Sequence, residues 1–133
     1  MVKKIHHIGI VVKNFDDTLK VYTKLLGKAP ESSGALPGGK IRVANYRVGE
    51  TALEFLEGGA GGPFADFISQ RGEGLHHIAV EVDDIVAELK KITASGIKGD
   101  KEPRQGPDGK IAFVGPDGAH GVTIELVQPD KKK

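Results

Sequence analysis

The chain carries two histidine pairs, each at the head of a short apolar segment, and two glutamates set among apolar residues. The pairs are His6-His7 and His76-His77, which lie 70 positions apart in a chain of 133 residues. Glu54 and Glu125 lie 71 positions apart and have similar neighbours. Imidazole nitrogens and carboxylate oxygens bind borderline to hard divalent metal ions. The repeated spacing therefore indicates two half-length units that bring these donors to one metal centre.

Strand alternation predicts which member of each pair faces the metal, because successive side chains in a strand point to opposite faces. One face of each His strand is branched and suits a covering helix, while the other face is less bulky. A buried carboxylate without a partner costs several kcal/mol, so each Glu is expected to meet a cation. The predicted ligands are His7, Glu54, His77 and Glu125. We assign His6 and His76 to structural or ligand-supporting roles and place His120 in an exposed loop.

Two imidazoles and two carboxylates, with no sulfur donor, suit a single divalent ion. The ions that we expect are Co²⁺ first, and otherwise Ni²⁺, Mn²⁺, Zn²⁺ or Fe²⁺. An octahedral ion with four protein ligands would keep two adjacent positions open for water or a chelating substrate. These ligand types do not distinguish among these metal ions.

The bulk composition points to an ordinary globular domain that acts on a small molecule. Nineteen Lys and Arg balance eighteen Asp and Glu, so charge implies no nucleic-acid or membrane partner. There is no cysteine, which fits a reducing compartment. No apolar run reaches the roughly 20 residues of a membrane span, and residues 1–4 lead directly into a strand. We expect a cytoplasmic protein.

The predicted fold class is α+β, with two tandem βαβββ modules forming a curved, incompletely closed eight-stranded barrel around the metal site. We expect one domain over residues 1–133, with repeat 1 at about 5–57, a connector and short helix at about 58–74, and repeat 2 at about 75–128. Asn14 and Asp84 are predicted to cap a helix in each repeat. The stretch 32–39, rich in Ser, Gly and Pro, predicts a surface loop.

The chain resembles the vicinal oxygen chelate superfamily, whose members pair βαβββ modules around a divalent metal. Within it, the chain looks most like the methylmalonyl-CoA epimerases, and the resemblance extends from His6 to Gln128. It rests on residues 6–12, 71–85, 110–113 and 122–126, and the doubled His between Gly-Leu and Val-Asp-Asp-Ile is its most specific part. The family's metal ligands align with His7, Glu54, His77 and Glu125, and the second of them is Gln in some members.

The resemblance implies a metal-dependent epimerase that interconverts (2R)- and (2S)-methylmalonyl-CoA. A metal on the thioester oxygen would stabilise the enolate formed when the C2 proton leaves. Inversion needs two acid/base groups: Glu125 is the first candidate and Glu54 the second, with Glu31 and Glu50 more remote. Some epimerases place a carboxylate on the strand after the Gly/Pro loop, but residues 32–49 hold no acid and Arg42 lies there instead.

Alternatives remain open. A glyoxalase I (lactoylglutathione lyase)-like enzyme would use the same two-His, two-Glu set, and a non-catalytic small-molecule binder of the superfamily would need no metal. Basic groups for the phosphates of an acyl-CoA substrate are found around a Gly/Pro loop, at Lys101, Arg104 and Lys110. Lysines in such loops are, however, usually solvated surface. Many relatives dimerise, so a homodimer is expected.

Overall fold

The computed structural model describes residues 1–36, 38–59 and 62–131, and this part of the chain is α+β. Its first half contains β1 (Val2–Val12), α1 (Phe15–Leu26), β2 (Ser32–Ala35), β3 (Arg42–Val48) and β4 (Thr51–Glu57). A connecting helix, α2 (Pro63–Arg71), follows. The second half contains β5 (Gly74–Val82), α3 (Ile85–Ala94), β6 (Arg104–Gln105), β7 (Gly109–Val114) and β8 (Ile124–Pro129). Each half is therefore one βαβββ module, as predicted.

The strands belong to one mixed eight-stranded sheet with the hydrogen-bonding order β2-β3-β4-β1-β5-β8-β7-β6. β5 and β8 are parallel, whereas β7 pairs antiparallel with β8. The α+β class and the two repeated modules are thereby confirmed. The chain forms two compact units, one of residues 1–7 and 77–133 and another of residues 8–76, so β1 and β5 each contribute to both units. The predicted single domain and its repeat boundaries stay a prediction.

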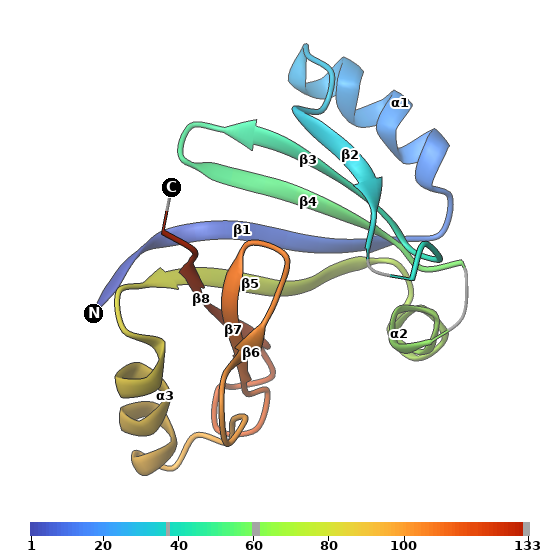
Figure 1. Ribbon diagram of the computed structural model, residues 1–133. Helices are drawn as coiled ribbons and strands as arrows, with labels where there is room; N and C mark the ends of the chain where they lie inside the picture. The colour runs from blue at the N-terminus through green and yellow to red at the C-terminus, as the bar shows by residue number, and fades with distance from the viewer. Residues whose placement is uncertain (37, 60–61, 132–133) are drawn as a thin grey trace. The chain divides into compact units, whose positions relative to one another are not determined.

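The unit of residues 8–76 has its core between α1 and one face of its strands (Figure 1). The Asn14 side chain accepts a hydrogen bond from the Asp17 backbone N–H at 3.0 Å, and the helix ends at Gly27, whose φ is 72°. A left-handed residue at this point suits glycine. The buried residues of this core are Val12, Phe15, Ala44, Tyr46 and Phe55.

The unit of residues 1–7 and 77–133 has an equivalent core beneath α3 (Figure 1). Asp84 caps this helix by accepting a hydrogen bond from the Ala87 backbone N–H at 3.1 Å. The buried residues here are Val82, Ile85, Leu89, Ala112, Val114 and Leu126. In both units the branched strand residues pack against the helix, so the predicted assignment of strand faces is confirmed.

The sequence did not predict the positions of two strands, β2 and β6. β2 occupies Ser32–Ala35, inside the predicted surface loop, and all four of its residues are exposed. It forms because its backbone pairs with β3, from Ser32 opposite Asn45 to Ala35 opposite Arg42. β6 has two residues and pairs with β7. Residue 37 of the predicted loop, residues 60–61 of the connector and the last two lysines lie outside the described residues.

Among the described residues, no helix is both long and apolar enough to cross a membrane.

Candidate metal centre

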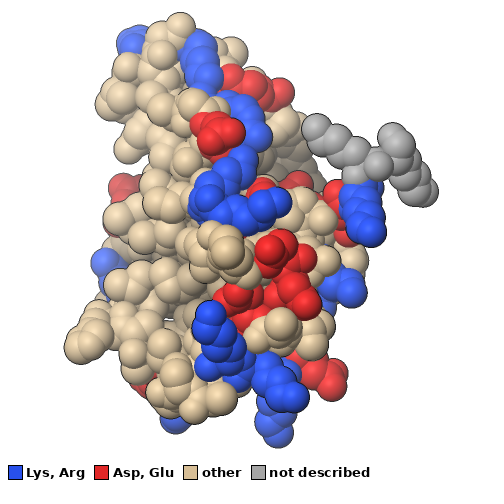
Figure 2. Space-filling model, turned by 90° about the vertical axis from the view of Figure 1, so that its left-hand side faces the viewer, with Lys and Arg blue, Asp and Glu red and all other residues tan. Residues whose placement is uncertain are grey.

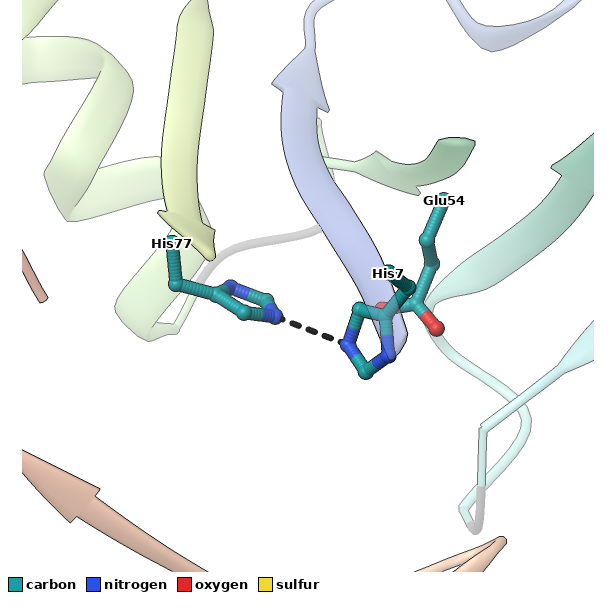
Figure 3. Close-up of side chains that lie close together, drawn as sticks. All are labelled: His7, Glu54 and His77. Atoms are coloured by element: carbon teal, nitrogen blue, oxygen red, sulfur yellow. Dashed lines mark hydrogen bonds between the residues drawn. The ribbon is translucent and has the colours of Figure 1, made fainter. Parts of the chain in front are cut away.

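Two histidine rings meet inside the unit of residues 1–7 and 77–133. His7 on β1 and His77 on β5 are each 5% exposed, and their Nε2 atoms lie 3.1 Å apart (Figure 3). The rings are nearly perpendicular, with centroids 5.2 Å apart. At this distance either one nitrogen donates a proton to the other, or both lone pairs face a shared cation. The Nε2 atoms of His7 and His77 are therefore close enough to bind one metal ion together.

Glu125 on β8 joins the two imidazoles in the same unit. Its Oε2 lies 3.1 Å from Nε2 of His7 and 4.0 Å from Nε2 of His77, and the residue is 7% exposed. Two ligand atoms at right angles on an octahedral ion, each about 2.1 Å from it, lie about 3.0 Å apart. The two separations of 3.1 Å match this value, and the separation of 4.0 Å lies below the about 4.2 Å between ligands on opposite sides of such an ion. This set of buried donors fits a divalent ion.

Glu54, the fourth predicted ligand, lies on β4 in the unit of residues 8–76 and is half-buried. Its neighbour Phe55 is buried in the core beneath α1, so Glu54 points to the opposite face of the strand. With the two imidazoles it supplies donor types that could hold a metal ion (Figure 3). Because Glu54 belongs to the other unit, its membership of the centre stays a prediction, as do the metal-binding roles of the other three residues.

His6 contacts a predicted ligand directly. Its Nδ1 lies 2.8 Å from Nδ1 of His7. If His7 offers the Nε2 lone pair to a cation, its proton lies on Nδ1 and is donated to His6. Burial lowers the pKa of His6, and the neighbouring His7 lowers it further, so His6 is neutral and can accept. The ligand-supporting role assigned to His6 agrees with this contact.

The other two histidines have different surroundings. The His76 ring packs against Phe64 and Phe67 of α2, at centroid distances of 5.2 and 4.9 Å, which agrees with a structural role. His120 is exposed, as predicted, and has a left-handed φ of 56°.

One aromatic contact of the centre is not evident from the sequence. The Phe113 ring on β7 lies edge-on to His77, at a centroid distance of 6.0 Å. Phe113 is also the direct strand partner of Glu125, so it covers one side of the candidate ligands. The signal that could have found it is the alternation of β7, in which Ala112 and Val114 face the helix and Phe113 faces away.

Glu31, a remote candidate for the second acid/base, and Arg42, which lies where some epimerases have a carboxylate, are both held in ion pairs within the unit of residues 8–76. The Glu31 carboxylate accepts hydrogen bonds from Lys28 Nζ and from the Arg47 backbone N–H, both at 2.6 Å, and the lysine contact is the main cause of its lowered pKa. Glu31 is therefore a weak base. Arg42 lies over the Phe15 ring at 4.7 Å and donates to Glu57 at 2.7 Å.

Comparison with known proteins gives the family. The model of the Glyoxalase/Bleomycin resistance protein/Dioxygenase superfamily matches residues 6–114. An uncharacterized Bacillus subtilis protein, YqjC, is 34% identical over 95% of this chain and 92% of its own. Human mitochondrial methylmalonyl-CoA epimerase is 30% identical over 94% of this chain and 73% of its own. A probable lactoylglutathione lyase from Synechocystis is 33% identical over 96% of each chain.

A solved structure of a methylmalonyl-CoA epimerase has a similar fold. A variant of Streptomyces coelicolor methylmalonyl-CoA epimerase in complex with 2-nitronate-propionyl-CoA has a TM-score of 0.86 and 29% identity, over 97% of this chain and 96% of that one. The fold and the buried donor set define a member of the vicinal oxygen chelate class. The chain belongs to the Glyoxalase/Bleomycin resistance protein/Dioxygenase superfamily, and its relatives include methylmalonyl-CoA epimerases.

Proposed function

We propose that this protein is a metal-dependent epimerase that interconverts (2R)- and (2S)-methylmalonyl-CoA. The observation that carries the proposal is the close grouping of His7, His77 and Glu125, with separations of 3.1 to 4.0 Å, in a chain whose relatives include epimerases of this substrate. These three residues, with Glu54, would hold the ion. A cytoplasmic location and a homodimer remain predictions.

The substrate explains why such a centre is useful. A malonyl thioester has two oxygens, on the thioester carbonyl and on the carboxylate, that can occupy two adjacent positions of an ion. When bound, the ion supplies Lewis-acid stabilisation of the negative charge that develops on the thioester oxygen as C2 loses its proton. The buried surroundings of His7 and His77 exclude water and so strengthen electrostatic interactions.

The proton transfers are assigned to carboxylates of this chain. Glu125 is the proposed base on one side of C2. Inversion needs a second acid/base on the other side, and β3 offers none, because the residue directly opposite Glu54 is Asn45 and the next residues on that face are Val43 and Arg47. Glu54 is therefore the proposed second group.

Loss of stereochemical purity tests this function. Purified protein loaded with Co²⁺ is mixed with (2S)-methylmalonyl-CoA, and the two epimers are separated by chiral chromatography over time. We expect the (2S) form to decay to a near-equal mixture, since the two epimers differ only at C2. A pure (2S) sample after prolonged incubation, with Co²⁺, Ni²⁺, Mn²⁺, Zn²⁺ and Fe²⁺ each tested, would overturn the proposal.

Glyoxalase I activity is the second candidate, and the similarity to a probable lactoylglutathione lyase favours it. Glu54, a carboxylate at the position where some epimerases have Gln, also fits this reaction. Consumption of the methylglyoxal–glutathione hemithioacetal, measured on the same metal-loaded protein, separates the two candidates. Turnover of the hemithioacetal without epimerisation would assign the protein to the lyases.

A further inference from the structure

A hollow between α3 and the segment that forms β6 and β7 is lined by several basic side chains. It has a volume of about 720 Å³ and lies wholly within the unit of residues 1–7 and 77–133. Its basic lining residues are Lys90 on α3, Lys101 in the loop before β6, Arg104 on β6 and Lys110 on β7; Glu102 is its one acidic lining residue. We call this hollow the α3–β7 cleft. Four cations and one carboxylate give it a net positive charge.

The charges of the cleft are not used in ion pairs. Among the residues that the structure describes, no carboxylate lies within 4.0 Å of the charged nitrogens of these four side chains. Three basic residues elsewhere are paired: Lys28 with Glu31, Arg42 with Glu57, and Lys98 with Asp117. On the face shown in Figure 2, basic and acidic side chains are interspersed. The feature that distinguishes the cleft is that four unpaired cations line one hollow, an arrangement that suits a polyanion.

The cleft is connected to the candidate metal centre through side-chain contacts within this unit. Arg104, which lines the cleft, places its guanidinium carbon 5.6 Å from the centre of the Phe113 ring. Phe113 in turn contacts His77. Lys110 lies three residues before Phe113 on β7, or about 10 Å along the strand. The pantetheine arm of coenzyme A is longer than this span.

The short edge strand β6 leaves room for the pantetheine arm to pass around the edge of the sheet. Lys110 and Phe113 lie on opposite faces of β7, because Ala112 and Val114 pack beneath α3 while Phe113 faces His77. β6 is the outermost strand of the order on this side and has only two residues. A flexible chain can therefore pass around β6, beside Arg104, from the metal face to the cleft.

We propose that the α3–β7 cleft binds the phosphates of coenzyme A, with Lys101 and Lys110 as the main phosphate ligands and Arg104 beside the pantetheine arm. The inference rests on the proposed acyl-CoA substrate and assigns the part of this chain that recognises it. The acyl group reaches the candidate metal centre, and the ribose phosphate and diphosphate remain in the cleft.

Direct binding of coenzyme A, without any acyl group, tests the inference separately from catalysis. Isothermal titration uses three probes: coenzyme A, 3′-dephospho-coenzyme A and pantetheine. The test variant is Lys101→Glu/Lys110→Glu, and Lys101→Met/Lys110→Met preserves the apolar stems. Lys91→Glu is the matched control, because Lys91 is exposed on the same helix but does not line the cleft. Circular dichroism confirms that each variant is folded.

We expect the Kd for coenzyme A to rise at least about tenfold in both double variants, since each lost charge-assisted contact costs about this factor. The Kd for pantetheine should stay within twofold, and Lys91→Glu should behave as the unchanged protein. An unchanged coenzyme A affinity in the double variants, an equal loss for pantetheine, or no coenzyme A binding by the unchanged protein would overturn the inference. Coenzyme A binding that depends on Lys101 and Lys110, in a protein that shows no epimerisation, would support the inference and overturn the proposed function.

Discussion

His7 and His77, 70 residues apart in the chain, place their Nε2 atoms 3.1 Å from each other inside one compact unit. A hydrogen bond from one ring to the other accounts for this contact when one Nε2 carries the proton. A shared cation would account for it as well by accepting both lone pairs, and Glu125 at 3.1 Å from His7 would add negative charge beside a divalent ion.

Replacing His77 by Ala should abolish metal retention while the fold survives, because the ion loses one of its two nitrogen donors. Metal content after desalting is measured by plasma mass spectrometry, and folding by circular dichroism. His120→Asn is the matched control: it removes an exposed histidine and tolerates the left-handed φ of 56° at that position. Full metal occupancy in His77→Ala would contradict the ligand assignment.

Replacing Glu125 by Gln should lower kcat for epimerisation by about 10²- to 10⁴-fold, the usual value of a positioned acid/base group. The amide oxygen can still bind an ion but cannot accept the proton. Glu54→Gln should retain more metal than Glu125→Gln, since Gln occurs at this position in some relatives of the epimerase type. Unchanged turnover in Glu125→Gln would remove this residue from the base role.

The sequence predicted the local elements and strand faces well, because both depend on neighbouring residues. Asn14 and Asp84 cap their helices as expected, and strand alternation correctly separated Phe55 from Glu54. Three strands after each helix were predicted, but the position of β2 was not, because an exposed Ser-Ser-Gly-Ala segment becomes a strand only through pairing with β3.

The contacts of side chains were less predictable. Nothing in the order of residues shows that His6 would hydrogen-bond His7, because adjacent strand residues normally face opposite sides. The stacking of Arg104 on Phe113 also depends on tertiary structure, since the two residues lie on different strands.

Replacing His6 by Leu should weaken metal affinity by about ten- to a hundredfold, since the hydrogen bond that orients a metal-binding histidine contributes about this much. Competition with a fluorescent chelator measures the change. His76→Phe is the control, because it keeps the aromatic packing against Phe64 and Phe67 and should leave the affinity unchanged. An equal loss in both variants would attribute the effect to the fold instead of the contact with His7.

Replacing Arg42 by Met should reduce stability at pH 7 more than at pH 3. Arg42 holds the Glu57 carboxylate, and the hydrogen bond to Arg42 is the main cause of the lowered pKa of Glu57. A carboxyl that is more acidic in the folded chain contributes stability above its unfolded pKa, and this is lost as the pH falls through the lowered folded pKa. Urea midpoints at the two pH values measure the difference.

Arg71→Met serves as the control for this experiment, because Arg71 lies over the Phe67 ring at 5.9 Å and is an exposed arginine of the same unit. Its midpoint should shift equally at both pH values. The same pH dependence in Arg42→Met and in the unchanged protein would show that the ion pair with Glu57 does not contribute.

Deuterium incorporation at C2 of methylmalonyl-CoA in D₂O, followed by mass spectrometry, tests the central claim most directly. The protein is measured as metal-loaded, after removal of metal by a chelator, and after Co²⁺ is restored. We expect rapid gain of one mass unit with metal, near-background exchange without it, and recovery on reconstitution. Exchange at the same rate in the stripped protein, or none in the loaded protein, would contradict metal-dependent proton transfer at the centre formed by His7, His77 and Glu125.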